Sequence, residues 1–154
     1  MKHFESVNDV LDFAIEREQE AAEFYTDLAN KMDRPWMQQV FEQFAGEERG
    51  HKEKLLAVKS GKTVLFAKQK VLDLKIGDYL VDVDAEQAPT ELDYQEALIV
   101  AMKKEKAAFK LYTDLASSTD DEHLARLLQG LAQEEAKHKL RFEIEYDEQF
   151  LKEN

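Results

Sequence analysis

The chain has 154 residues, no cysteine, five glycines, two prolines and a net charge of −12. This length predicts one domain, which we place at residues 1–154. The absence of cysteine excludes disulfides, thiolate catalysis, iron–sulfur clusters and zinc ribbons. The acidic balance argues against a nucleic-acid partner and against binding to an anionic membrane surface. No apolar run is long enough to span a bilayer and the N-terminal residues show no signal pattern, so we expect a soluble, cytoplasmic protein.

Apolar residues recurring at spacings of three and four predict four long helices. The predicted ranges are 6–31, 35–59, 90–117 and 119–151. Three of these helices start with a capping-box pattern, in which a hydroxyl and a later carboxylate satisfy free backbone N–H groups. The three pairs are Ser6 with Asp9, Thr90 with Asp93, and Thr119 with Glu122. Short links within each pair of helices predict two antiparallel hairpins.

A long connection, at about residues 60–89, joins the two predicted hairpins. It carries many apolar residues, which a solvated linker would not: Val64, Leu65, Phe66, Val71, Leu72, Leu74, Ile76, Tyr79, Leu80, Val81 and Val83. We therefore expect it to pack against the helices. It is also long enough to run the length of a bundle, because an extended chain covers about 3.3 Å per residue. The second and third helices would then be parallel.

The two predicted hairpins repeat one another in sequence. A shift of 87 residues, the separation of Glu18 from Glu105, aligns them without a gap. The aligned segments include the sequence YTDLA at 25–29 and at 112–116, and the set Glu47, Glu48, His51 and Lys52 with the set Glu134, Glu135, His138 and Lys139. A repeated helical hairpin implies a pseudo-two-fold axis, so whatever one half contributes to the centre, the other half contributes again.

Ionisable residues interrupt the apolar stripe of each predicted helix. Two stripes carry a single glutamate, Glu18 or Glu105, and the other two carry Glu-x-x-His, as Glu48 with His51 and Glu135 with His138. Buried ionised carboxylates are costly, and no Lys or Arg interrupts these stripes to compensate them. Two divalent ions would balance four carboxylates, and this residue pattern is that of dimetal four-helix bundles. A single Glu-x-x-His would more often be a solvated helix face, and a purely structural polar core is the alternative.

These residues, together with Tyr25 and Tyr112, resemble the rubrerythrin-type branch of the ferritin-like diiron proteins. The resemblance covers nearly the whole chain and implies an all-α, ferritin-like four-helix bundle of two repeated hairpins joined by a long crossover. It also implies two iron ions per chain, held by Glu18, Glu48, His51, Glu105, Glu135 and His138. Manganese and zinc stay open as alternative metals, because carboxylate-rich sites also suit them.

The sequence departs from the rubrerythrin pattern in two respects. No cysteine is present to form the rubredoxin domain that usually supplies electrons, so we expect a separate electron-donor protein. Rubrerythrins also carry a further glutamate one turn after the third-helix ligand, where this chain has Ala108. This difference puts rubrerythrin-style peroxidase chemistry in doubt and leaves a symmetrical site closer to that of bacterioferritin.

Several functions remain compatible with such a site. The favoured interpretation is a diiron oxidoreductase that reduces peroxide or dioxygen. Ferrous iron oxidation for storage, a non-catalytic metal-binding protein and dimanganese catalase chemistry are alternatives. The repeated hairpins and the long crossover predict at least a homodimer, with domain swapping an open question.

Four further residues are predicted to support the metal ligands. Tyr25 and Tyr112 lie two turns after Glu18 and Glu105, and they either fill the core or donate to a ligand carboxylate, as the resemblance implies. A metal-bound histidine usually donates its other ring N–H to a carboxylate. We therefore predict that the histidines donate across the pseudo-axis, His138 to Glu47 and His51 to Glu134; ordinary surface glutamates are the alternative.

Overall fold

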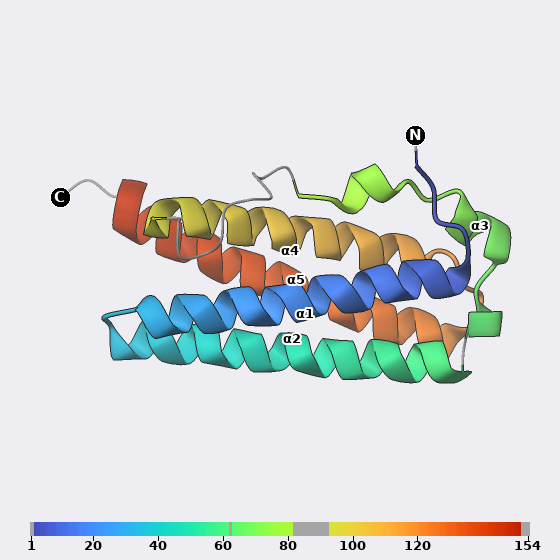
Figure 1. Ribbon diagram of the computed structural model, residues 1–154, viewed down its shortest axis with the longest axis horizontal. Coiled ribbons are helices and arrows are strands. Elements are labelled where there is room, and N and C mark those ends of the chain that lie inside the picture. Colours follow the sequence, from blue (N-terminus) through green and yellow to red (C-terminus); the bar gives the residue numbers. More distant parts are fainter. Residues whose placement is uncertain (1, 62, 82–92, 152–154) are drawn as a thin grey trace.

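The computed structural model describes residues 2–61, 63–81 and 93–151. Its four long helices are α1 (Val7–Lys31), α2 (Pro35–Gly61), α4 (Tyr94–Ala116) and α5 (Glu122–Tyr146). Figure 1 shows that α1 and α2 form one antiparallel hairpin and α4 and α5 another, while α2 and α4 run in the same direction. The predicted all-α architecture is therefore confirmed. Within the described residues, no helix is long and apolar enough to cross a membrane.

The start of α1 follows the predicted capping pattern in part. The Ser6 side chain accepts a hydrogen bond from the N–H of Asp9 at 3.0 Å, as expected for an N-cap. The Asp9 carboxylate accepts from the N–H of Glu5, also at 3.0 Å, rather than from the N–H of Ser6. Ser6 thus satisfies a free N–H of the first turn, whereas Asp9 binds the N–H of the residue before the N-cap.

Aspartates cap the two helices of the second hairpin. Asp93 accepts from the N–H of Glu96 at 2.7 Å at the start of α4. The predicted partner of Asp93, Thr90, lies outside the described residues. At the start of α5, Asp121 accepts from the N–H of Leu124 at 2.8 Å.

The predicted cap of α5 by Thr119 was wrong. The Thr119 hydroxyl instead donates to the carbonyl of Leu65 at 2.7 Å and accepts from the N–H of Asp121 at 3.1 Å. It ties the crossover to the α4–α5 link, and the Asp121 carboxylate takes the capping position. At its other end, α5 continues into a π-helical turn at Asp147–Leu151, so the helical segment reaches the predicted limit.

The described part of the crossover packs against the bundle with some of its apolar residues. It contains the short helices η1 (Thr63–Leu65), α3 (Lys68–Leu72) and η2 (Ile76–Tyr79). Its buried residues are Phe66, Val71 and Tyr79. Val64, Leu65 and Leu80 are exposed, contrary to the expectation that the apolar residues pack, and Val83 lies outside the described residues. The Tyr79 hydroxyl donates to Asp114 at 2.7 Å, which fixes η2 against α4.

Two apolar clusters fill the bundle. One includes Val10, Leu55, Leu115 and Leu124 together with the buried crossover residues, and lies near the start of α1. The other includes Leu28, Phe41, Leu98 and Phe142, and lies near the α1–α2 link. The stripe-breaking glutamates and histidines occupy mid-helix positions between these clusters. Apolar side chains thus shield the polar layer from solvent at both ends.

A buried ion pair holds the α1–α2 link against α5. Glu145 is fully buried, and its carboxylate accepts from Arg34 at 3.0 Å and from the Tyr94 hydroxyl at 2.5 Å. The Arg34 guanidinium also lies over the rings of Trp36 and Tyr94, at 5.2 and 5.7 Å from their centroids. Because a buried carboxylate without its cation is strongly unfavourable, this contact should matter for stability.

We predict that Arg34→Met lowers the free energy of unfolding by about 3 kcal/mol, because it leaves the Glu145 carboxylate buried and unpaired. Arg126→Met is the control, since Arg126 and Glu122 form a pair in which both side chains are mostly exposed, and it should cost about 0.5 kcal/mol or less. Chemical denaturation measures both values. The double variant Arg34→Met/Glu145→Gln should recover part of the loss, and equal stability of the two single variants would contradict the prediction.

Candidate metal centre

The four long helices bring the six predicted ligands into one buried layer. Glu18 comes from α1, Glu48 and His51 from α2, Glu105 from α4, and Glu135 and His138 from α5. Each of the six residues is at most 2% exposed. A spacing of three residues places each Glu-x-x-His pair on one helix face, so α2 and α5 each present a carboxylate and an imidazole to the centre.

The six side chains form two overlapping groups that could each hold a metal ion. One group contains Glu18, Glu48, His51 and Glu135, and the other contains Glu48, Glu105, Glu135 and His138. Within each group the candidate ligand atoms all lie within 4.8 Å of one another. Glu48 and Glu135 belong to both groups, so each would contribute to holding both ions, whereas Glu18 and Glu105 would each contribute to one.

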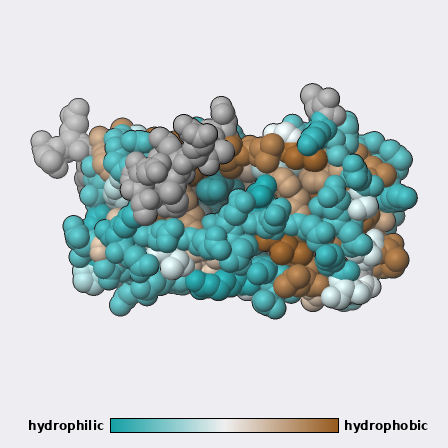
Figure 2. Space-filling model, in the orientation of Figure 1, coloured by the Kyte–Doolittle hydropathy of each residue, from teal (hydrophilic) through white to brown (hydrophobic). Residues whose placement is uncertain are grey.

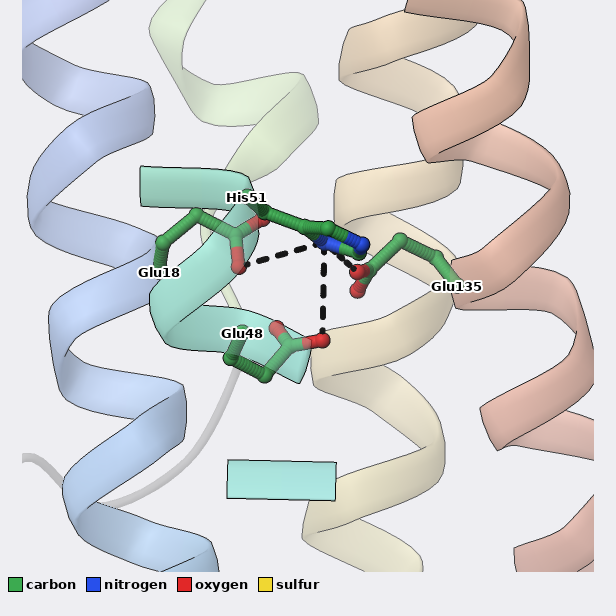
Figure 3. A group of neighbouring side chains, drawn as sticks. All are labelled: Glu18, Glu48, His51 and Glu135. Atoms are coloured by element: carbon green, nitrogen blue, oxygen red, sulfur yellow. Dashed lines mark ion pairs between the residues drawn. The ribbon is translucent and has the colours of Figure 1, made fainter. Parts of the chain in front are cut away.

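The imidazole of His51 faces the carboxylates of the first group (Figure 3). Its Nδ1 atom lies 2.7 Å from Glu135 Oε1, 3.6 Å from Glu18 Oε2 and 3.7 Å from Glu48 Oε1. The same nitrogen of His138 lies 3.1 Å from Glu48 Oε1 and 3.6 Å from Glu105 Oε1. The two rings are nearly parallel, with an interplanar angle of 11° and centroids 6.4 Å apart.

One atom of each of the six side chains is buried without a hydrogen-bond partner among the described residues. These atoms are Glu18 Oε2, Glu48 Oε1, His51 Nδ1, Glu105 Oε2, Glu135 Oε1 and His138 Nδ1. The short approach of His51 Nδ1 to Glu135 Oε1 does not have hydrogen-bond geometry. Buried polar atoms are normally paired, so six unpaired donor atoms in one layer fit a pair of divalent cations.

The other ring nitrogen of each histidine contacts a glutamate across the pseudo-axis. Nε2 of His51 contacts the carboxylate of Glu134, and Nε2 of His138 contacts that of Glu47. Each contact joins α2 to α5, and both glutamates are partly exposed. If Nε2 carries the proton, Nδ1 is left with its lone pair directed into the layer, which is the state that binds a metal.

The two tyrosines donate across the bundle to Glu18 and Glu105. We call these two the terminal glutamates, because each belongs to only one of the two groups. The Tyr25 hydroxyl on α1 donates to Glu105 on α4, and the Tyr112 hydroxyl on α4 donates to Glu18 on α1. Burial, followed by the charges of the nearby glutamates, raises the pKa of both hydroxyls well above the ordinary value. Both tyrosines therefore stay protonated and hold one oxygen of each terminal glutamate, leaving the other free.

Without metal, the electrostatics of the layer favour proton uptake. Burial raises the pKa of Glu48 and Glu135 well above the ordinary carboxyl range, and the neighbouring carboxylates raise it further. Burial lowers the pKa of His138, but hydrogen bonds and charge from Glu105 and Glu48 outweigh this and raise it to about 11. The layer thus attracts positive charge, as protons or as metal.

The two halves of the layer are not identical. The phenyl ring of Phe44 stacks on the His138 ring, with centroids 4.1 Å apart and planes inclined by 23°. The repeat places Leu131 at the position equivalent to Phe44 in the other half. Aromatic stacking adds a favourable contact beyond the burial of apolar area, so the two histidines have different surroundings.

A family model described as Rubrerythrin matches residues 9–146. The chain belongs to the rubrerythrin family. Its buried Glu/His cluster is accordingly a rubrerythrin-like diiron-carboxylate type of site.

Two solved structures share this fold. A candidate ferritin-like diiron-carboxylate protein from Thermotoga maritima is similar with a TM-score of 0.76 and 21% identity, over 96% of this chain and 99% of that chain. A hypothetical protein from Pyrococcus furiosus is similar with a TM-score of 0.69 and 26% identity, over 93% of this chain and 89% of that chain. No curated protein matches the sequence. The rubrerythrin-family chain therefore has a ferritin-like fold.

Three residues near the site were missed by sequence reasoning. Phe44 gives no signal in the sequence beyond an apolar helix position, because no sequence rule relates a phenylalanine on α2 to a histidine on α5. Arg17 and Lys104 line a cavity beside the carboxylates. Each directly precedes a terminal glutamate at the same point of the repeat, and this recurrence could have identified them.

We predict that Glu47→Gln and Glu134→Gln each weaken metal affinity by about 10–100-fold, because the histidine loses the carboxylate that orients its ring. Metal titration by calorimetry measures the affinity. Glu53→Gln, on the exposed face of α2, is the matched control and should bind metal like the parent. Parent-like affinity in both Gln variants would show that these contacts do not support metal binding.

We also predict that the metal-free protein loses stability as pH rises. The folded pKa values of Glu48, Glu135 and His138 are raised, so the native state binds protons more tightly than the unfolded state. The carboxyl contributions are complete below the ordinary value of 4.5 and are lost as pH rises above it. The His138 contribution is complete below 6.5 and is lost towards about 11.

Thermal unfolding of the chelated protein between about pH 5.5 and pH 8.5 tests this pH dependence. The melting temperature should fall across this range, and chelation should therefore lower it more at the upper end than in mild acid. The metal-loaded protein is the control, because its surface is the same but the metal ions balance the charge of the buried carboxylates. Its melting temperature should change less over the same pH range. A metal-free melting temperature that rises with pH would contradict the prediction.

Proposed function

We propose that the chain is a dimetal oxidoreductase, with two iron ions per chain, which reduces peroxide or dioxygen with electrons from a separate donor protein. The observation that carries the proposal is the set of six unpaired ligand atoms, arranged as two groups that share Glu48 and Glu135. Four carboxylates balance the charge of two divalent ions. Family membership supports the same chemistry.

The residues of the chain would prepare the site for this chemistry. A pair of ferrous ions supplies two electrons, the number that reduces one peroxide with two protons to two water molecules. Glu134 and Glu47 orient the histidines, and the tyrosine hydroxyls hold the terminal glutamates. The apolar clusters on either side keep bulk water away from the layer.

None of the 154 residues is a cysteine, so these residues do not supply the cysteine-bound iron that feeds electrons in rubredoxin-type domains. A separate donor protein is therefore part of the proposal. We also propose a homodimer, with or without domain swapping. The redox chemistry proposed for one bundle does not depend on it.

Ferrous iron oxidation for storage is the second candidate function. The observation that favours it is Ala108, which leaves the centre with the symmetrical set of four glutamates and two histidines. Storage requires a mineral core inside a large shell, whereas an oxidoreductase needs only a small oligomer. Aerobic loading with excess ferrous iron, followed by sizing and iron analysis, distinguishes the two.

Anaerobic reconstitution with ferrous iron tests the proposed function. We expect two irons per chain by metal analysis and, with reduced methyl viologen as the electron source, repeated consumption of peroxide. Glu48→Gln should bind fewer than two irons and lose this turnover, because it removes a bridging ligand. Glu53→Gln is again the control on the same helix.

Two results would contradict the proposal. One is a chain that binds fewer than two irons when fully reconstituted. The other is a diiron protein that consumes peroxide and dioxygen no faster than the Glu48→Gln variant does.

A further inference from the structure

A cavity of about 490 Å³ lies between α1 and α4, with the end of η2 and the residues after it forming one wall. The four carboxylates of the metal centre, Glu18, Glu48, Glu105 and Glu135, line its floor. Peroxide and dioxygen are only slightly larger than water, which occupies about 30 Å³ in the liquid. The cavity is therefore many times larger than these oxidants require, and it falls within the range of sites that hold organic ligands.

Small side chains create this space directly beside the carboxylates. Ala21 and Ala108 line the cavity one turn after Glu18 and Glu105, at equivalent positions of the repeat. A larger residue at either position would project into the space that now separates α1 from α4. The room beside the centre is thus a property of both halves of the chain.

Most of the wall above the carboxylates is apolar. Its apolar residues include Phe13, Phe24, Tyr79, Leu80, Val100 and Leu111. The hydrophobic residues on the surface in Figure 2 also gather mainly in the half that carries the crossover helices of Figure 1. A wall of this kind favours an alkyl or aromatic body over a small polar molecule, because apolar surface is removed from water on binding.

Two cations at equivalent positions of the repeat reach the same cavity. Arg17 pairs with Glu20 at 2.9 Å and lies 4.5 Å from the centroid of Phe13. Its Nε atom is buried and has no hydrogen-bond partner among the described residues. Lys104 lies 5.5 Å from the centroid of Phe24 and forms no ion pair within the described part of the chain. The cavity therefore offers two donor groups with capacity left for a ligand, Nε of Arg17 and the ammonium of Lys104.

Acidic groups also line the cavity, and two of the three that lie outside the floor have a hydrogen-bond partner. Glu20 is paired with Arg17, and Glu23 accepts from Gln19 at 2.9 Å. Asp27 is half-buried at one edge. The four floor carboxylates would be neutralised by two divalent ions in the proposed centre, but would repel an anion without them. Anion binding should therefore depend on the metal.

We propose that this cavity binds an organic monocarboxylate with a medium-length apolar body, with the carboxylate at Arg17 and Lys104 and the body against the apolar wall. The proposal rests on the proposed dimetal function, because the metal ions neutralise the floor. The proposed ligand is larger than peroxide, and its apolar body would occupy the cavity space beside Ala108.

Calorimetric titration of the zinc-loaded protein with octanoate tests the proposal, and zinc keeps redox chemistry out of the measurement. We expect one octanoate per chain, no binding by the metal-free protein, and much weaker binding of acetate, which lacks the apolar body. Lys104→Gln should weaken octanoate binding by about tenfold or more, since it removes a charged hydrogen bond. Lys106→Gln, on the exposed face of α4, is the matched control and should bind like the parent.

Ala108→Leu provides a second, independent variant, because it fills the cavity without changing its charge. It should abolish octanoate binding while retaining two zinc ions. Full zinc loading without octanoate binding, or equal octanoate affinity in the parent, Lys104→Gln and Ala108→Leu proteins, would overturn this proposal alone. A parent chain that binds fewer than two zinc ions would overturn the proposed metal centre, and this proposal with it.

Discussion

Four carboxylates buried in the middle of an apolar bundle set the main constraint on this molecule. Each would be costly as an isolated ion, and together they repel. The structure directs one unpaired oxygen of each towards a shared centre and adds one unpaired imidazole nitrogen from each of two histidines. Apolar clusters cover this layer towards both ends of the bundle. The stability of the bundle is therefore coupled to the positive charge that the layer holds.

The internal repeat explains most of the layer and also where it becomes asymmetric. Every ligand, and every side chain that holds a ligand, has a counterpart in the other half: Tyr25 with Tyr112, and Glu47 with Glu134. Phe44 breaks the symmetry by stacking on His138, where the other half has Leu131. Glu145 breaks it again, because its counterpart is Val58, and the buried carboxylate is paired with Arg34 from the other hairpin. Two similar halves thus form a centre with unequal surroundings.

The residues beside the metal layer differ between the α2–α5 side and the α1–α4 side of the bundle. On the side of α2 and α5, the partly exposed Glu47 and Glu134 lead directly to the histidines. On the side of α1 and α4, a cavity with apolar walls and two cations leads to the carboxylates. An acidic surface attracts metal cations, whereas the cavity suits an organic molecule. The two sides of the centre therefore differ in charge and in polarity.

The sequence by itself determined the four helices, their pairing into hairpins and the ionisable residues on their inner faces. Helical periodicity and an internal repeat are local patterns, so they can be read without knowing which helices touch. Helix starts were less predictable, because Thr119 competes with Asp121 for the capping position and is used instead to hold the crossover. Likewise, the apolar character of Val64 and Leu80 did not bury them.

The tertiary structure decided contacts across helices that the sequence left open. The histidine–glutamate pairs across the pseudo-axis were predicted, but the partners of the two tyrosines were not. Tyr25 lies two turns after Glu18, too far along its own helix to contact it. It donates instead to Glu105, which the packing of α4 against α1 brings within reach. The cavity beside Ala21 and Ala108 is likewise invisible in sequence, because its volume depends on how far apart α1 and α4 are held. Spacing along a helix fixes the face on which a residue lies, but the separation and register of neighbouring helices arise from the packing of the whole core.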